Sequence, residues 1–140
     1  MSEQEIRDVL DAYAATVHAR DVDGHVGLYD DDVHLFDAWE EFEARGKEAL
    51  RAATEQWFGS LGEERVRVTF DDAIVVADGD VGFVHAAVVF AAETASGERV
   101  RAMRNRFTFG LRRDGRWRIV HQHSSLPISM VTMTAVPPPA

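Results

Sequence analysis

The chain of 140 residues is 46% hydrophobic and 28% charged, a composition typical of one folded domain. Its formal net charge of −9 argues against duplex nucleic acid and against an anionic membrane surface as partners, because both attract basic proteins. It contains no cysteine, which excludes disulfides, thiolate metal sites and a cysteine nucleophile.

The start of the chain and its apolar runs bear on where the protein works. The first residues, "MSEQEIRDVL", lack the basic and then apolar pattern of a signal peptide. No apolar run approaches the roughly 20 residues of a membrane span. We therefore expect a cytoplasmic protein with one domain, residues 1–134, and a loose tail, residues 135–140.

Two helices are predicted at the start of the chain. Apolar residues at spacings of three and four predict an amphipathic helix over residues 3–19. Asp21 is the expected cap of a short second helix, and the acidic run 30–32 is expected at the solvated end of that helix. The stripe of the first helix consists of Ile6, Val9, Leu10, Tyr13 and Val17.

A short strand and a third helix follow. The sequence "VHLFDAW", residues 33–39, alternates loosely and predicts the strand. Gly46 then opens a helix over residues 47–61. Its expected apolar stripe consists of Leu50, Ala53, Trp57 and Leu61.

The second half of the chain has the period of two that is typical of strands. Three short sequences, "DGD", "SGE" and "RDG", separate the alternating segments and are typical of hairpin turns. Helices followed by a meander of long strands predict an α+β domain with the helices on one face of the sheet. We expect the sheet to be a curved, cone-shaped antiparallel sheet that encloses an apolar pocket with the three N-terminal helices. The strand segments are residues 65–80, 81–94, 98–115 and 116–125.

Two long stretches carry a resemblance to known families. Residues 13–50, from "YAATVHARD" to "EARGKEAL", are similar to the first half of bacterial ketosteroid isomerases. Residues 111–127, "LRRDGRWRIVHQHSSLP", resemble the closing hairpin of SnoaL-like proteins and of the association domain of calcium/calmodulin-dependent kinase II. The chain is thus identified as a SnoaL-like member of the nuclear transport factor two-like superfamily. That fold hosts isomerases, cyclases, hydrolases and non-catalytic modules.

The resemblance implies a catalytic set. Tyr13 falls where the isomerases place the tyrosine that donates to the developing dienolate oxygen, and Asp37 where they place the proton-shuttling aspartate. Asn105 lies near the position of the third group, although a shift of one residue would put Arg104 or Arg106 there instead. Abstraction of a proton next to a carbonyl needs such a base and such donors.

Further side chains are candidates for the pocket. Trp39 and Trp57 are expected to shape it, together with Phe36 and Phe90. His85 interrupts an apolar strand, so it is expected either to be hydrogen-bonded in the core or to face a wet cavity. Arg106 is a candidate ligand clamp, with solvent or an interface as the alternative.

His121 and His123 lie two residues apart in the last strand, so their side chains share one face. They could bind a metal, line the pocket or lie in a subunit interface, and we assign no metal ligands because no spacing matches a metal motif. By the closing-hairpin comparison, Gln122 and Ser124 face the cavity. The face led by Trp117, which includes both histidines, is then the outer surface through which a homodimer forms. A bulge would reverse this assignment and place the histidines in the pocket.

The sequence therefore predicts a domain that binds a small apolar organic molecule without any cofactor. The leading hypothesis is an isomerase, cyclase or dehydratase in which Asp37 is the base and Tyr13 the oxyanion donor. The first alternative is a non-catalytic ligand-binding or association module. The second alternative is a metal-dependent enzyme that uses His121 and His123.

Overall fold

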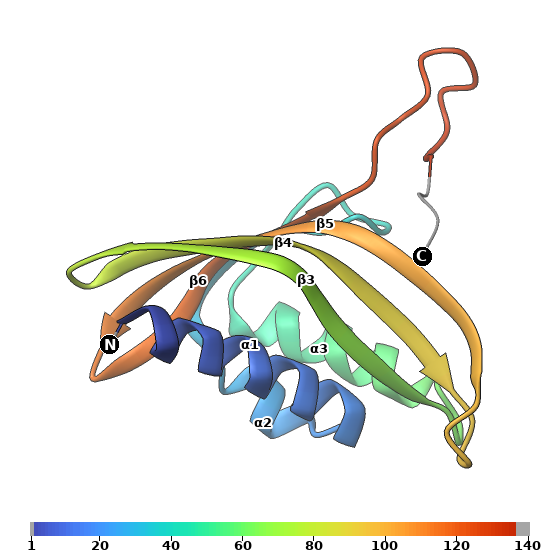
Figure 1. Ribbon diagram of the computed structural model, residues 1–140, viewed down its shortest axis with the longest axis horizontal. Coiled ribbons are helices and arrows are strands. Elements are labelled where there is room, and N and C mark those ends of the chain that lie inside the picture. The colour runs from blue at the N-terminus through green and yellow to red at the C-terminus, as the bar shows by residue number, and fades with distance from the viewer. Residues whose placement is uncertain (1, 137–140) are drawn as a thin grey trace.

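The three helices cover one face of the sheet (Figure 1), and the computed structural model describes residues 2–136. The predicted tail lies mostly outside these residues. The elements in chain order are α1 Ser2–Ala19, α2 Val22–Val26, β1 Tyr29–Phe36, β2 Ala44–Arg45, α3 Lys47–Gly59, β3 Arg65–Asp78, β4 Val81–Glu93, β5 Arg99–Asp114 and β6 Arg116–Ser125.

The six strands form one curved sheet in the order β2-β1-β6-β5-β4-β3. The pair β1–β6 is parallel and every other pair is antiparallel. Figure 1 shows that the sheet curls over the helices without closing on itself. The predicted α+β class, the three N-terminal helices and the curved sheet are thus confirmed. We call the face that the helices cover the inner face, and the opposite face the outer face.

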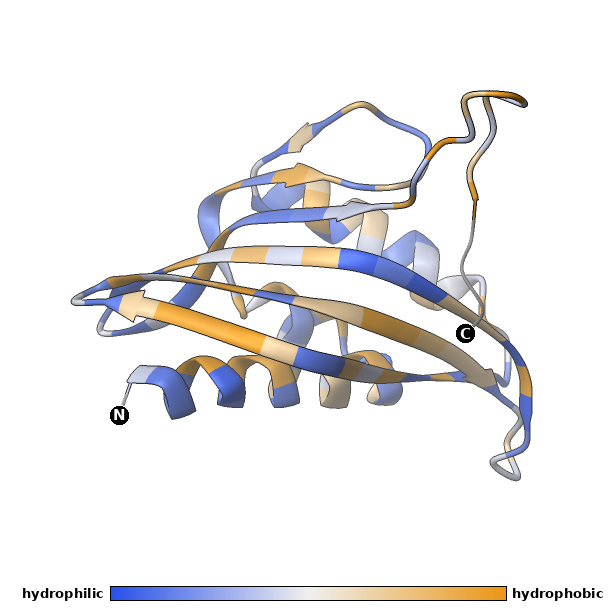
Figure 2. Ribbon diagram, turned by 45° about the horizontal axis from the view of Figure 1, so that its top comes forward, coloured by the Kyte–Doolittle hydropathy of each residue, from blue (hydrophilic) through white to orange (hydrophobic). Residues whose placement is uncertain are grey.

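The two N-terminal helices form as predicted. Hydrophobic and hydrophilic residues alternate along α1 in Figure 2, and its buried side chains lie on the inner face of the molecule. The Asp21 side chain accepts a hydrogen bond from Gly24 N at 3.0 Å, which caps α2. The buried side chains of α1 are Ile6, Leu10, Tyr13 and Val17, so burial pulls this face onto the sheet.

Two details of the predicted elements are wrong. In α3, Thr54 and Phe58 are buried in place of Ala53 and Trp57, because a period of 3.6 allows either neighbour and the contact with the sheet selects one. The acidic run 30–32 is in β1 rather than at a helix end. Strand β1 pairs with β6, and this tertiary pairing overrides the local pattern.

A bulge in β6 decides which side chains face inward. Gly110 pairs with His121, but Leu111 pairs with Ile119, so Val120 is an extra residue on β6. Trp117 and Ile119 precede the bulge and are buried with 4% and 0% exposure, so the expectation that they lie on the outer surface is wrong. The residues beyond the bulge follow the expected phase: Gln122 and Ser124 point inward, whereas His121 and His123 point outward.

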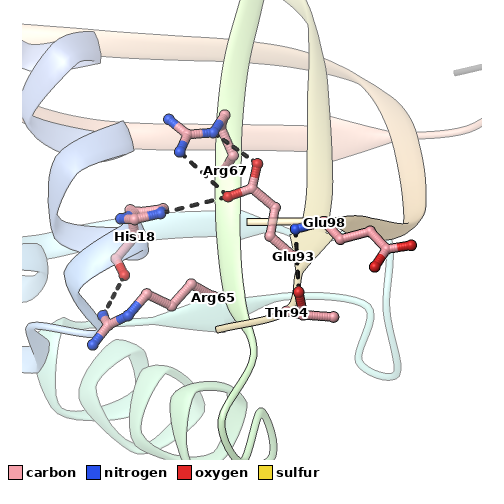
Figure 3. Close-up of polar contacts among 6 residues, drawn as sticks. All are labelled: His18, Arg65, Arg67, Glu93, Thr94 and Glu98. Carbon is pink, nitrogen blue, oxygen red and sulfur yellow. Dashed lines mark hydrogen bonds and ion pairs between the residues drawn. The ribbon is translucent and has the colours of Figure 1, made fainter. Parts of the chain in front are cut away.

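A polar cluster fixes the end of α1 to the sheet (Figure 3). Glu93 of β4 accepts hydrogen bonds from Arg67 of β3 at 2.9 and 3.3 Å. His18 Nε2 lies 3.7 Å from the same carboxylate, and Arg65 donates to the His18 carbonyl oxygen at 2.8 Å. The helix layer and the two edge strands therefore meet at this corner.

Candidate functional site

Asp37 lies directly after β1, beside the inner face of β6. Its Oδ1 accepts a hydrogen bond from Ser124 Oγ at 2.8 Å and one from Ala38 N at 2.7 Å. Ser124 is buried, whereas Asp37 is exposed. Its Oδ2 has no hydrogen-bond partner among residues 2–136. One carboxylate oxygen is therefore held in place, and the other is free to take a proton.

Tyr13 presents its phenol to the interior from α1. It is 3% exposed, and its ring contacts Phe70 and Phe109 with centroid distances of 5.7 and 5.6 Å. Burial, reinforced by the negative charge of Asp37, raises the pKa of Tyr13 well above its usual value of 10. The hydroxyl is therefore protonated near neutral pH. It donates to no partner in the described part of the chain, so it is available to a ligand oxygen.

Tyr29 is a second buried phenol beside the first. Its hydroxyl donates to Gln122 Oε1 of β6. Burial raises the pKa of Tyr29, and the neighbouring Tyr13 and the charge of Asp37 add to the effect. Tyr29, Gln122 and Ser124 thus form a polar line along the inner face that ends at Asp37.

His25 of α2 lies between the two tyrosines. Its ring is 4.9 Å from that of Tyr13 and 5.5 Å from that of Tyr29. Thr16 Oγ1 donates its proton to the Tyr13 carbonyl oxygen at 3.1 Å, so in its 3.0 Å contact with His25 Nδ1 it must accept. Burial lowers the pKa of His25 to about 4, against an opposing effect from Asp21. The imidazole is therefore neutral, with its proton on Nδ1.

Asn105 lies on the inner face of β5 and is 5% exposed. Its Oδ1 is buried and has no hydrogen-bond partner among the described residues. A buried amide without partners is costly, and a ligand with a polar group would relieve that cost. Asn105 also borders a hollow of about 250 Å³.

Two hollows are the most prominent on the described part of the molecule. The larger, of about 620 Å³, lies between the start of α1 and β3, and it touches neither Tyr13 nor Asp37. The smaller hollow is the better candidate because it adjoins Asn105. Its volume is slightly below the range that is typical of pockets for drug-sized molecules, so it suits a small ligand. Its lining residues are Ala87, Arg104, Asn105, Arg106, Leu126 and Pro127.

Three of the predicted pocket residues lie on the outer face instead. His85 is exposed there, with its ring stacked 6.2 Å from that of Phe83. His121 and His123 lie further along the same face. Alternation along β4 places His85 opposite to the buried Val84, which explains why this strand contains a histidine.

The remaining predicted residues lie at the edges of the site. Arg106 is exposed and donates from Nε to Ser125 Oγ at 3.2 Å. Trp39 is 56% exposed in the loop after β1. Trp57 is half-buried, and its ring lies 6.0 Å from that of Phe90. Of the proposed pocket aromatics, Trp57 and Phe90 are therefore the pair that packs against the core.

The described residues contain no group of three or more His, Cys, Asp or Glu side chains that could hold a metal ion. His121 Nδ1 is instead hydrogen-bonded to the His34 carbonyl oxygen at 2.8 Å. A carbonyl oxygen only accepts, so this nitrogen carries a proton. The second alternative from the sequence thus has no geometry in its support. Within residues 2–136, no helix combines the length and the apolarity needed to cross a membrane.

The chain belongs to the SnoaL-like domain family, whose model matches residues 6–129. A solved NTF2-like protein of unknown function from Pseudomonas putida is 28% identical, with a TM-score of 0.86 over 99% of this chain and 96% of that one. An NTF2-like protein with a cystatin-like fold from Novosphingobium aromaticivorans is 20% identical, with a TM-score of 0.77 over 94% and 85%.

A third similar structure is that of Aln2 from a Streptomyces species, which is 16% identical and has a TM-score of 0.76 over 88% of each chain. At these identities the last two structures show the fold alone. No curated protein matches the chain.

The sequence pattern missed His25 as a member of the site. A histidine in a five-residue helix gives no periodic signal, although its position one turn after the Asp21 cap and four residues before Tyr29 is visible in the sequence. The partner of Tyr29 was also hidden, because Gln122 is 93 residues away in the chain.

Proposed function

We propose that this protein is a cofactor-free enzyme that moves a proton next to the carbonyl group of a small, largely apolar molecule. Asp37 Oδ2 takes a proton from the carbon beside the carbonyl. The Tyr13 hydroxyl donates a hydrogen bond to the oxygen, which becomes negative as the enolate forms. Asp37 then returns the proton to the same or another carbon, so the reaction is an isomerisation, or one step of a cyclisation or dehydration.

The observation that carries the proposal is the relation between Asp37 and Tyr13. The charge of Asp37 contributes to the raised pKa of Tyr13, so the carboxylate and the phenol share one electrostatic environment. The phenol is neutral and has no partner in the described part of the chain, while the carboxylate keeps one oxygen free. A preorganised donor of this kind stabilises negative charge in the transition state without reorganisation.

Asn105 is the proposed second donor to the same oxygen. Its side-chain amide lies on the inner face, and the Oδ1 position lacks a partner. Since the oxygen and nitrogen of an amide are assigned from their contacts, a ligand oxygen can be met by the amide N–H group. Aromatic side chains, above all Trp57 and Phe90, supply the apolar surroundings.

The test is an isomerisation assay with a probe that needs only this chemistry. 3-Cyclohexenone becomes conjugated when a proton moves, and the change is read by ultraviolet absorbance. We expect Asp37→Asn to reduce the rate on the order of a hundredfold or more, because a positioned base contributes about 10²–10⁴. Glu40→Gln, which removes an exposed carboxylate from the same loop, is the matched control. Equal rates for the two variants would contradict the mechanism.

A non-catalytic binding module is the second candidate, and the exposure of Asp37 favours it. A carboxylate in water lacks the dry surroundings that strengthen a base near neutral pH. This function predicts that the probe ketone perturbs the NMR signals of Asn105 and Tyr13 without being turned over. In that case Asp37→Asn binds the ketone as well as the original chain does.

A further inference from the structure

The outer face of the sheet carries an uncharged band that crosses five strands. Strand pairing aligns two rows of side chains, each with one residue from β3, β4, β5, β6 and β1 in turn. The first row is Ile74, His85, Thr108, His123 and Phe36. The second row is Val76, Phe83, Gly110, His121 and His34. We call these ten residues the outer band.

The outer band is apolar and exposed at its β3–β4 end. Ile74, Val76 and Phe83 are 52%, 49% and 42% exposed. The band contains no Asp, Glu, Lys or Arg, although 28% of the chain is charged. A contiguous exposed patch of this kind in an otherwise charged surface marks an interaction site.

The other end of the outer band is a cluster of rings. His34 and His121 lie 5.1 Å apart, and Phe36 lies 5.1 Å from His121 and 5.6 Å from His123. Four of the six histidines of the chain are in the band. None of these four points toward Tyr13, so the proposed chemistry does not use them.

The centre of the outer band is small, because Thr108 and Gly110 separate the two bulky ends. Gly110 does not have a positive φ, so its backbone does not require glycine. An added Cβ would meet His121 Cβ at 3.6 Å and Val120 Cγ2 at 3.9 Å, which are ordinary contacts. The chain itself thus has room for a side chain at this position. Glycine inside a strand is unfavourable, and it often marks the close approach of another backbone.

We infer that the outer band is the interface of a homodimer whose two-fold axis passes between Thr108 and Gly110, and that protonation of its histidines separates the two copies. A two-fold axis at the small centre lays the histidine end of each copy on the aliphatic end of the other. The two sheets then pack face to face, as in a sandwich.

Charge favours a second copy as the occupant. Each copy carries a formal net charge of −9, so two copies can associate only through a surface that is free of fixed acidic charge. The outer band is such a surface, and its two ends are complementary in shape and polarity. Figure 1 also shows that the loop after β1 and the segment after β6 both rise on this side of the sheet. Their tips expose Phe42, Met130 and Val131, with 90%, 94% and 92% exposure, where they can flank a partner.

The charged neighbours of the histidines are few. His34 Nε2 lies 3.6 Å from Glu43 Oε1, and that carboxylate also binds Arg45 at 3.0 Å. His121 and His123 face each other and His34, and His85 faces Phe83. Fixed charges flank the band on the neighbouring strands: Asp71 and Asp78 of β3, Arg106 and Arg112 of β5, and Arg118 of β6.

Acid therefore weakens the dimer. Burial already lowers the pKa of His121, and its neighbours His34 and His123 add to this effect. The aliphatic end of the partner would bury it further, so its pKa is lower in the dimer than in the separate chain. The dimer is then favoured above the ordinary histidine pKa and is lost as the pH falls below it. One further pKa unit at His121 in each copy corresponds to about a hundredfold in Kd.

The test is sedimentation equilibrium of the full chain between roughly 1 and 100 µM at pH 8 and pH 5. We expect a dimer at pH 8 with a Kd about a hundredfold higher at pH 5. Gly110→Leu should be monomeric at both pH values with an unchanged melting temperature at low concentration. Gly59→Leu is the matched control, because a Cβ at Gly59 also meets nothing within 4 Å, and it should dimerise normally. His121→Gln retains a donor for the His34 carbonyl and should reduce the pH dependence.

A monomer at pH 8 and 100 µM would overturn the interface. So would equal dimerisation of Gly110→Leu and Gly59→Leu, or assemblies that keep growing with concentration, because these indicate a contact that is not two-fold. An equal Kd at pH 5 and pH 8 would overturn the role of the histidines. These outcomes are independent of Asp37 and of the proposed reaction.

Discussion

The buried histidine His25 makes the folding stability of this protein depend on pH in a way that can be calculated. Its pKa is about 4 in the folded chain, against a usual value of about 6.5 in an unfolded one. Between these values the unfolded chain binds the extra proton, so stability falls as the pH is lowered through 6.5 and the loss is complete below pH 4. The difference corresponds to about 3 kcal/mol in total and to about 2 kcal/mol by pH 5.

The assay is urea unfolding at pH 8 and pH 5 for the original chain and for His25→Gln. Glutamine stays neutral and can still donate to Thr16 Oγ1, so the variant loses the titration rather than the hydrogen bond. Its stability at pH 8 will be lower, because the smaller contact with the Tyr13 and Tyr29 rings is lost. The quantity of interest is the change between the two pH values, which we expect to be smaller by about 2 kcal/mol in the variant.

This double difference removes the effects of the other histidines. Both proteins carry the same outer band, so any linked dissociation cancels. If the original chain and His25→Gln lose the same free energy between pH 8 and pH 5, then His25 is already protonated or is exposed. The tautomer deduced from Thr16, with the proton on Nδ1, would then also be wrong.

The two buried tyrosines give a matched pair of variants. Tyr29→Phe leaves Gln122 Oε1 without its donor and should cost about 1–3 kcal/mol of stability in urea unfolding, whereas Tyr13→Phe removes a hydroxyl without a described partner and should cost less. Equal costs would mean that the Tyr29 bond contributes nothing. Glu93 should respond to acid, because its hydrogen bond from Arg67 lowers the pKa of the carboxyl. Stability from this bond is present above the unfolded value of about 4.3 and is lost as the pH falls through the folded value, so Glu93→Gln should flatten thermal stability between pH 5 and pH 3. An unchanged slope would contradict the contribution of Glu93.

The local pattern of the sequence was sufficient for the elements and for much of the core. The spacing of apolar residues located α1 and its buried face, and the period of two located the four long strands. These features depend on neighbours within one or two turns, so they are present in the sequence itself. The resemblance to ketosteroid isomerases added Tyr13 and Asp37, and the structure places the charge of one near the phenol of the other.

The contacts that complete the site depend on pairings between distant segments. The Ser124 hydroxyl reaches Asp37 across 87 residues of chain, and Gln122 reaches Tyr29 across 93. The one-residue bulge at Val120 reverses the phase within β6, so Trp117 is in the core while Ser124 still faces the site. No periodicity could reveal that reversal, because the strand alternates regularly on both sides of the bulge.

The sequence by itself determined the class of fold, the order of the elements and the chemical types available to the site, since these follow from local periodicity and composition. Only the tertiary structure decided which face of α3 is buried, that His25 lies between two tyrosines, and that four histidines share the outer face. The physical reason is that side-chain direction repeats locally, whereas strand register is set by packing between residues that are far apart in the chain.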